Sequence, residues 1–206
     1  MGRFSQAISE GDGISVIPVL GQGDIGALAA AADAAGAEAI AVRSVADVAE
    51  ARSRTDLPIL VLELIRDADG LRAVQEGGGD ACALVFEELA GEEEWLEERH
   101  SEAVELGLDC ALDVHDEDEL AAALERVDPE ILIISERDPE KDEEELERTL
   151  ELLPDVPAGK LVVSESRVSA REQVLALEGA GVDAVLLGTT IPAQGFGEVL
   201  AELTGR

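Results

Sequence analysis

The chain has 206 residues, 46% of them hydrophobic and 30% charged, which is enough for one domain with a sizeable apolar core. Its 47 acidic and 15 basic side chains give a net charge of −32, which argues against nucleic acid or an anionic membrane surface as a partner. No apolar run reaches the roughly 18 residues of a membrane span and the first residues show no apolar signal segment, so we expect a cytoplasmic protein.

Eight short apolar runs follow one another along the chain and are predicted to be β-strands. Each is nearly continuous in Val, Ile, Leu and Ala, which is typical of parallel strands covered on both faces. Cys82 and Cys110 lie within two of these runs, so we expect buried, reduced thiols. In chain order the predicted strands are 14–20, 38–42, 58–64, 81–87, 108–114, 130–136, 160–166 and 183–189.

The segments between these strands have the apolar spacing of amphipathic helices. Leu120, Leu124 and Val127, for example, fall on one helix face. Segments 116–119 and 169–172 resemble capping boxes at helix starts. The excess of acids is concentrated on these helices, where it fits a solvated outer face, and a salty or hot habitat could produce it. Eight strands alternating with helices, without a linker, predict a single α/β domain over residues 1–206: a (β/α)8 TIM barrel of near-minimal length with short βα loops.

In such a barrel, functional side chains lie at the carboxyl ends of the strands and in the loops that follow. Asp113 and Glu165 interrupt apolar runs at such ends, so each is either a catalytic candidate or a helix cap or ion-pair partner. Ser135 occupies the equivalent place in the sixth strand. His115 falls on the same side of its strand as Asp113, and the adjacent Asp116 could orient its imidazole.

The ends of the seventh and eighth strands predict a phosphate site. Many barrels bind a phosphate there through backbone N–H groups and a helix N-terminus. Ser166, Arg167, Gly188 and Thr189 occupy these ends, and Arg167 either contacts the phosphate or pairs with one of the many carboxylates. Glycine-rich nucleotide motifs and metal-ligand spacings are absent from the sequence, so we expect neither a cofactor nor a metal. The expected partner is a small phosphorylated molecule or free phosphate, bound by a monomer.

Taken together, five short motifs resemble those of the indole-3-glycerol phosphate synthase family. They are LPIL (57–60), DVHD (113–116), ISERD (134–138), SESRVS (164–169) and VDAVLLG (182–188). The resemblance covers the chain from about residue 14 to about residue 200. It implies a TIM barrel and, for the family, decarboxylation and ring closure of an anthranilate-derived ribulose phosphate in tryptophan biosynthesis.

Several of the family's catalytic groups are replaced at the matching positions. The resemblance places the strand-three lysine, the family's general acid, at Leu62. It places the strand-one lysine and glutamate at Pro18 and Leu20. The resemblance therefore implies that the standard ring-closing step lacks its proton donor here. A general acid typically contributes on the order of 10²–10⁴ in rate, so this loss is large.

Other family positions keep a polar side chain. The strand-five glutamate becomes Asp113, one methylene shorter, and the strand-six asparagine becomes Ser135. Glu165 and Ser166 match the family, while Arg167 replaces the glycine of its phosphate loop. The resemblance therefore supports the fold more strongly than the activity.

Three functional hypotheses remain open. The first is a divergent carbon–carbon lyase or isomerase acting on a small phosphorylated metabolite, with Asp113 or Glu165 as general base and Ser135 as a positioning group. The second is a non-catalytic minimal barrel, which the apolar residues at former catalytic positions favour. The third is the family's own reaction carried out with a substitute acid such as Glu63 or Glu87.

Overall fold

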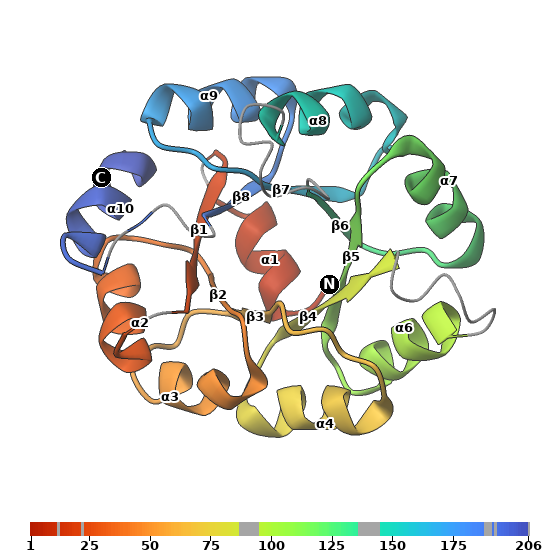
Figure 1. Cartoon of the computed structure of the whole chain (residues 1–206), viewed down its shortest axis with the longest axis horizontal. Helices are drawn as coiled ribbons and strands as arrows, with labels where there is room; N and C mark the ends of the chain where they lie inside the picture. Colours follow the sequence, from red (N-terminus) through yellow and green to blue (C-terminus); the bar gives the residue numbers. More distant parts are fainter. Residues whose placement is uncertain are drawn as a thin grey trace.

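The computed structural model is a closed barrel of eight parallel strands with helices around its outside (Figure 1). It describes residues 1–11, 13–21, 23–86, 95–135, 145–187, 191 and 193–205. Each strand pairs with the next in chain order, and β1 closes the barrel against β8. The strands are β1 Ser15–Leu20, β2 Ile40–Val42, β3 Ile59–Val61, β4 Ala81–Val85, β5 Asp109–Val114, β6 Ile131–Ile134, β7 Leu161–Glu165 and β8 Ala184–Leu187. The predicted (β/α)8 TIM barrel is thus confirmed.

The described helices begin and end at residues suited to those positions. Asp24, Asp67 and Asp116 each accept a hydrogen bond from a backbone N–H in the first turn of the helix they precede. Gly78 and Gly181 end two helices in the left-handed conformation, with φ of 90° and 100°. The helices are α1 Arg3–Ser9, α2 Ile25–Ala34, η1 Val45–Asp47 with α3 Val48–Arg52, α4 Ala68–Gly77, α6 Trp95–Glu105, α7 Glu117–Arg126, α8 Glu145–Leu152 with η2 Leu153–Asp155, α9 Arg171–Ala180 and α10 Phe196–Thr204.

Two of the local expectations need correction. The capping box expected at 169–172 does not form, because α9 begins at Arg171 and the Gln173 side chain accepts from the backbone N–H groups of Ser169 and Ala170. The third strand is shorter than the predicted 58–64 and ends at Val61. The predicted ends of the fourth, sixth and eighth strands, at 87, 136 and 188–189, lie outside the described residues.

Alternate strand residues divide the apolar side chains between two cores. One core fills the barrel and includes Ile17, Val19 and Leu60, whereas the other lies between strands and helices and includes Val16 and Leu20. Leu20, where the resemblance places one of the family's strand-one groups, therefore faces the helices and not the barrel interior. The strand-one residues that belong to the interior core are Ile17 and Val19.

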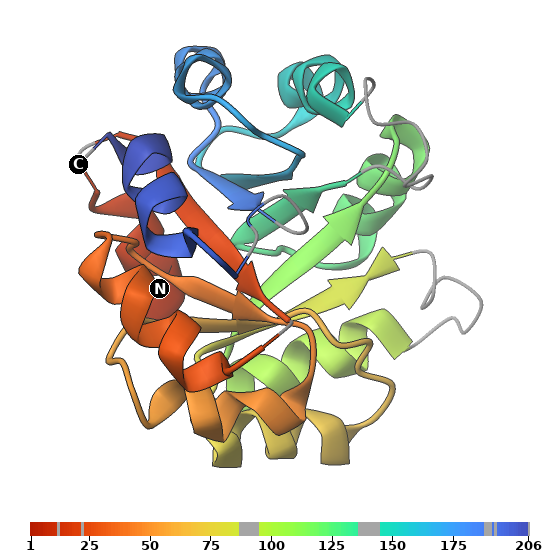
Figure 2. The same ribbon diagram turned by 60° about the vertical axis from the view of Figure 1, so that its left-hand side comes forward.

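The two cysteines belong to the outer core. Cys82 and Cys110 are free and buried, and they are direct neighbours in the register of β4 and β5. Their burial confirms the expectation from the apolar runs. The turned view shows the helices on the outer side of these strands (Figure 2). Among the helices that the structure describes, none is long and apolar enough to cross a membrane.

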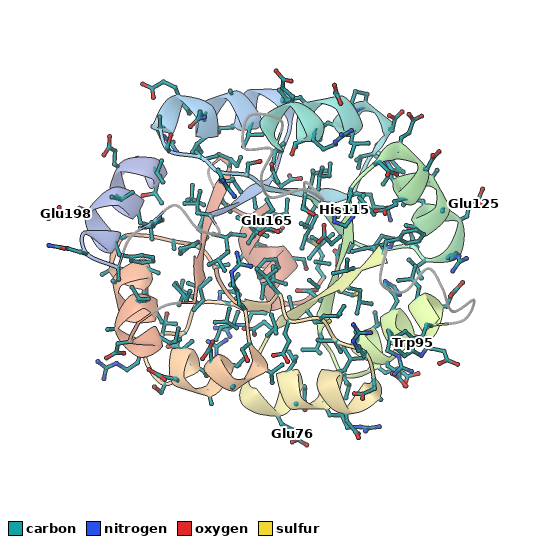
Figure 3. All side chains as sticks on the ribbon, in the orientation of Figure 1. Glu76, Trp95, His115, Glu125, Glu165 and Glu198 are labelled. Atoms are coloured by element: carbon teal, nitrogen blue, oxygen red, sulfur yellow. The ribbon has the colours of Figure 1, made fainter. Side chains whose placement is uncertain are left out.

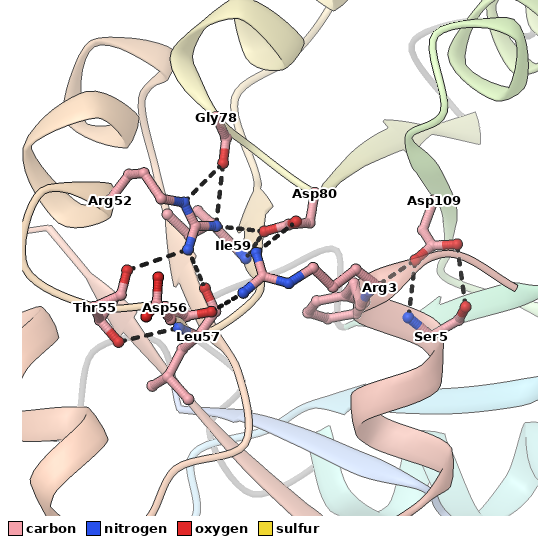
Figure 4. A network of polar contacts seen from close by, with 11 residues as sticks. Arg3, Ser5, Arg52, Thr55, Asp56, Leu57, Ile59, Gly78, Asp80 and Asp109 are labelled. Carbon is pink, nitrogen blue, oxygen red and sulfur yellow. Dashed lines mark hydrogen bonds and ion pairs between the residues drawn. The ribbon is translucent and has the colours of Figure 1, made fainter.

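The amino-terminal helix α1 closes one end of the barrel, a feature the sequence did not indicate. Phe4 and Ile8 are buried with the interior core, and Figure 1 shows α1 within the ring of strands. Asp109, at the start of β5, holds this helix: its Oδ2 accepts from the backbone N–H groups of Phe4 and Ser5, each at 2.9 Å (Figure 4). These contacts leave the opposite end, where the strands finish, as the place for a site.

Ionic contacts reinforce the closed end. Asp80, which directly precedes β4, pairs with Arg3 of α1 and with Arg52 of α3, and it also accepts from the backbone N–H of Ile59 (Figure 4). Arg52 in turn donates to the carbonyl oxygens of Gly78, Thr55 and Leu57. The network ties α1, α3, β3 and β4 together at the amino ends of the strands.

Candidate active site

Asp113 and Ser135 meet at the carboxyl ends of the neighbouring strands β5 and β6. Ala111 and Ile133 belong to the interior core, so strand alternation points Asp113 and Ser135 into the barrel as well. Ser135 Oγ donates a hydrogen bond of 2.7 Å to Asp113 Oδ1. The barrel therefore presents one oriented carboxyl group at its mouth, by which we mean the end formed by the carboxyl ends of the strands.

Burial raises the pKa of Asp113 to about 7. The hydrogen bond from Ser135 and the charge of His115 act in the opposite direction, because both favour the ionised carboxylate, while the carboxylates of Glu165 and Glu119 raise the pKa further. A carboxyl group that titrates near neutral pH can both accept and release a proton in one reaction cycle. Asp113 is thus suited to general acid–base chemistry.

Glu165 and Arg43 form an ion pair at the same mouth. Glu165 is the last residue of β7. It points inward because it lies two positions after the interior residue Val163 on the same strand. Arg43 directly follows β2, and its Nη2 lies 3.8 Å from Glu165 Oε1. Burial raises the pKa of Glu165, while the positive charges of Arg43 and His115 lower it. Sequence reasoning missed Arg43, although its place immediately after a predicted strand was a usable signal.

His115 is held by Glu119 and not by Asp116, contrary to the expectation. Its Nδ1 lies 2.9 Å from Glu119 Oε2, and its backbone N–H donates to the same oxygen at 2.9 Å. Asp116 instead caps α7. The reason is geometric: the first turn of a helix brings its third residue back over the residues that precede it. Figure 3 shows His115 and Glu165 on the inner side of the helices, whereas Glu76, Glu125 and Glu198 point outward.

The residues predicted to bind phosphate are described only in part. Ser166 is buried, and its hydroxyl hydrogen-bonds Ser164 Oγ, which in turn hydrogen-bonds Thr149 Oγ1 of α8 at 2.7 Å. The Ser166 hydroxyl therefore lies on the helix side of β7, opposite Glu165. Arg167 is partly buried in the loop that follows. Three candidates lie outside the described residues: Gly188, Thr189 and Glu87.

Comparison with known proteins settles the lineage. The family model of indole-3-glycerol phosphate synthase matches residues 21–198. A curated indole-3-glycerol phosphate synthase from Geobacillus sp. is 33% identical over 176 residues, which are 80% of this chain and 66% of that protein. The chain belongs to the indole-3-glycerol phosphate synthase family. A further relative, from Alkaliphilus metalliredigens, is 34% identical over 153 residues, 74% of this chain and 58% of its own length. This family member thus spans less than two thirds of the curated relatives named here.

Solved structures show the same fold at low sequence identity. A variant tryptophan synthase α-subunit from Pyrococcus furiosus superposes with a TM-score of 0.74 at 18% identity, and the match covers 100% of both chains. An N-acetylmannosamine-6-phosphate 2-epimerase from Clostridium perfringens gives a TM-score of 0.69 at 16% identity and covers 85% of this chain and 86% of its own. These likenesses concern the barrel alone.

The strand-three position at which the resemblance places a family lysine is apolar in this indole-3-glycerol phosphate synthase family member. Leu62 follows β3 directly and packs against the interior core, so it occupies the mouth where the resemblance places the lysine. Glu63 points the other way: its Oε2 accepts from the backbone N–H of Val45 at 2.6 Å and from Ser44 Oγ at 3.1 Å. Glu63 therefore caps the loop after β2 and is not placed as a substitute acid.

Within residues 1–11, 13–21, 23–86, 95–135, 145–187, 191 and 193–205, no group of three or more His, Cys, Asp or Glu side chains is arranged to hold a metal ion.

Proposed function

We propose that the barrel mouth binds a small phosphorylated metabolite and that Asp113 acts on it as a general acid–base group, in a lyase or isomerase reaction. The observation that carries the proposal is the Asp113–Ser135 pair. A carboxyl group with its pKa near 7, oriented by a 2.7 Å hydrogen bond at the carboxyl end of a barrel strand, has the properties such chemistry needs.

Ser135 and Glu165, which lie near Asp113 at the mouth, have different roles in this proposal. Ser135 orients the Asp113 carboxyl and favours its ionised form, so Asp113 starts as the base that accepts a proton from the ligand. Glu165 is a second carboxyl at the mouth, and its environment differs because Arg43 pairs with it. Two carboxyls held in different environments are the usual basis for separate acid and base roles.

A phosphorylated ligand is supported by the family and by the predicted phosphate loops. The curated relatives are named for indole-3-glycerol phosphate, which is a phosphorylated compound. We place the phosphate at the ends of β7 and β8, near Ser166, Arg167, Gly188 and Thr189. Because the Ser166 hydroxyl is engaged toward α8, we expect this residue to contribute its backbone N–H.

A non-catalytic barrel is the second candidate, favoured by Leu62 and Val19 on the mouth side of the interior core. An apolar wall there offers no proton donor at the family's lysine positions. In this case the mouth binds a ligand and leaves it unchanged.

Binding and proton exchange separate the two candidates. The wild type and Asp113→Asn are titrated by calorimetry with indole-glycerol phosphate, ribulose 5-phosphate and inorganic phosphate. Each of the two organic ligands that binds is then incubated with the protein in D₂O and followed by ¹H NMR. We expect saturable binding to both proteins and loss of a ligand C–H signal with the wild type alone. Glu125→Gln, on the outer face of α7, is the matched control and should behave as wild type. Binding without exchange would favour the non-catalytic barrel, and no binding of any of the three would contradict the proposal.

A further inference from the structure

The Arg43 side chain spans the mouth of the barrel. It starts beside β2 and reaches Glu165 at the end of β7, two strands separated by β1 and β8 in the barrel order. A Cβ atom built on Gly21 would lie 3.6 Å from Arg43 Cδ, so the aliphatic part of the arginine passes beside the residue that follows β1. The guanidinium group is therefore positioned over the interior side of the strand ends.

The contact between Arg43 and Glu165 is loose. Its length of 3.8 Å exceeds the roughly 2.7–2.9 Å of a charge-assisted hydrogen bond. Nearly half of the Arg43 side chain, 48%, stays exposed. An ion pair of this kind stabilises a fold very little. A guanidinium group nevertheless carries five N–H donors in a planar fork that matches carboxylate and phosphate oxygens.

The positive charge of Arg43 lowers the pKa of Glu165. Among the described residues, the charged or titratable groups that face Glu165 are Arg43, which follows β2, His115 from the loop after β5, and the Asp113 carboxyl of β5. Burial raises the pKa of Glu165, and Arg43 is the first of the groups that oppose this rise. If Arg43 pairs with another anion, Glu165 loses that opposition and becomes a stronger proton acceptor.

We propose that Arg43 is an anion-binding residue that exchanges partners: it pairs with Glu165 in the free protein and with an oxyanion group of the ligand in the complex. This inference rests on the proposed function, since it concerns a ligand at the same mouth. The exchange activates Glu165 only when a ligand is present. It also supplies a cation at the mouth from β2, in a barrel where the family's lysine positions on β1 and β3 are apolar.

Affinities test the first half of the exchange. Wild type, Arg43→Gln and Arg43→Lys are titrated by calorimetry with ribulose 5-phosphate, with neutral ribulose and with benzoate. Arg72→Gln, on the exposed face of α4, is the matched control. A hydrogen bond to a charged group contributes about 1.5–3 kcal/mol, so Arg43→Gln should weaken the affinity for ribulose 5-phosphate about 10- to 100-fold. Arg43→Lys should weaken it less. The affinity for neutral ribulose, and the affinities of the Arg72→Gln control, should stay unchanged. Loss of benzoate binding with ribulose 5-phosphate unchanged would assign the exchange to a carboxylate instead of a phosphoryl group.

The second half is tested by a ¹³C NMR titration of the Glu165 side-chain carboxyl. We expect its pKa to rise when ribulose 5-phosphate binds to the wild type, and to be raised already in free Arg43→Gln. Equal titration of Glu165 in wild type and Arg43→Gln would overturn the inference, as would equal affinities of both proteins for all probes. Those results leave the proposed function intact, whereas failure of every probe to bind the wild type would overturn both.

Discussion

Ser135 Oγ lies 2.7 Å from Asp113 Oδ1, and this hydroxyl donates to a carboxyl whose pKa burial has raised to about 7. The two residues come from neighbouring strands and meet at the end of the barrel opposite helix α1. Two effects on the pKa of Asp113 oppose each other: burial disfavours the ionised carboxylate and raises the pKa, whereas the hydrogen bond from Ser135 favours the carboxylate and lowers it. Protonation of Asp113 is therefore sensitive to changes in its immediate surroundings.

The stability of the protein should depend on pH through Asp113. Its pKa is about 7 in the folded state against an ordinary value of 3.8, so the folded state binds more protons between these values and the free energy of unfolding falls as pH rises from about 4 to about 7. Asp113→Asn removes this dependence. Because Asp113 keeps part of its surface exposed, we expect less than the full effect of the pKa shift. The free energy of unfolding of Asp113→Asn, relative to that of the wild type, should be about 1–3 kcal/mol higher at pH 8 than at pH 4. Urea denaturation at both pH values measures the difference. The Glu125→Gln control should show no such gain, and an identical pH slope in wild type and Asp113→Asn would contradict the raised pKa.

Removing the Ser135 hydroxyl should raise the pKa of Asp113 further. Ser135→Ala deletes the hydrogen bond that favours the carboxylate and leaves the burial in place. The ¹³C chemical shift of the Asp113 carboxyl, followed against pH, measures the change directly. Ser53→Ala, at the end of α3, is the control and should leave this titration unaltered. A fall in the Asp113 pKa would show that the hydroxyl supports the protonated form instead.

Asp109 should contribute more to stability than an ordinary helix cap. Its carboxylate accepts from the backbone N–H groups of Gly2, Phe4 and Ser5 and from the Ser5 hydroxyl, and it thereby holds α1 in the barrel end. We expect Asp109→Ala to cost about 2–4 kcal/mol of unfolding free energy, since several buried N–H groups lose their acceptor. Asp24→Ala, which removes one cap bond from α2, should cost about 1 kcal/mol. Equal losses for the two variants, measured by urea denaturation, would show that α1 contributes no more than a surface helix.

Restoring a lysine at the mouth should restore part of the family's chemistry. Leu62 occupies the position that the resemblance assigns to the general acid, and the carboxyls of Asp113 and Glu165 lie at the same end of the barrel. We expect Leu62→Lys to increase formation of indole-3-glycerol phosphate from the family's substrate by about 10²–10⁴ over wild type, as a general acid does. Indole fluorescence measures the product, and Leu62→Met is the control of similar volume. Tight binding of the substrate by Leu62→Lys without any product would show that further groups are missing.

Much of the fold could be predicted from local patterns. Apolar runs such as 130–136 and the helical spacing of Leu120, Leu124 and Val127 involve residues close together in the chain, so the strand or helix they form can be recognised without knowing their neighbours in space. The same reasoning placed Asp113, Ser135 and Glu165 at strand ends. Local patterns did not show that Leu20 faces the helices, because a shift of one residue reverses every side chain of a strand.

The amino-acid sequence by itself determined the alternating strands and helices, the membership of the barrel class and the family motifs at the strand ends. Only the tertiary structure decided that Asp109 holds α1 and that Arg43 reaches Glu165. The physical reason is the range of the interactions. Period and propensity act over a few residues, whereas these contacts, such as the one between Gly2 and Asp109 that are 107 positions apart, exist only once the barrel has closed.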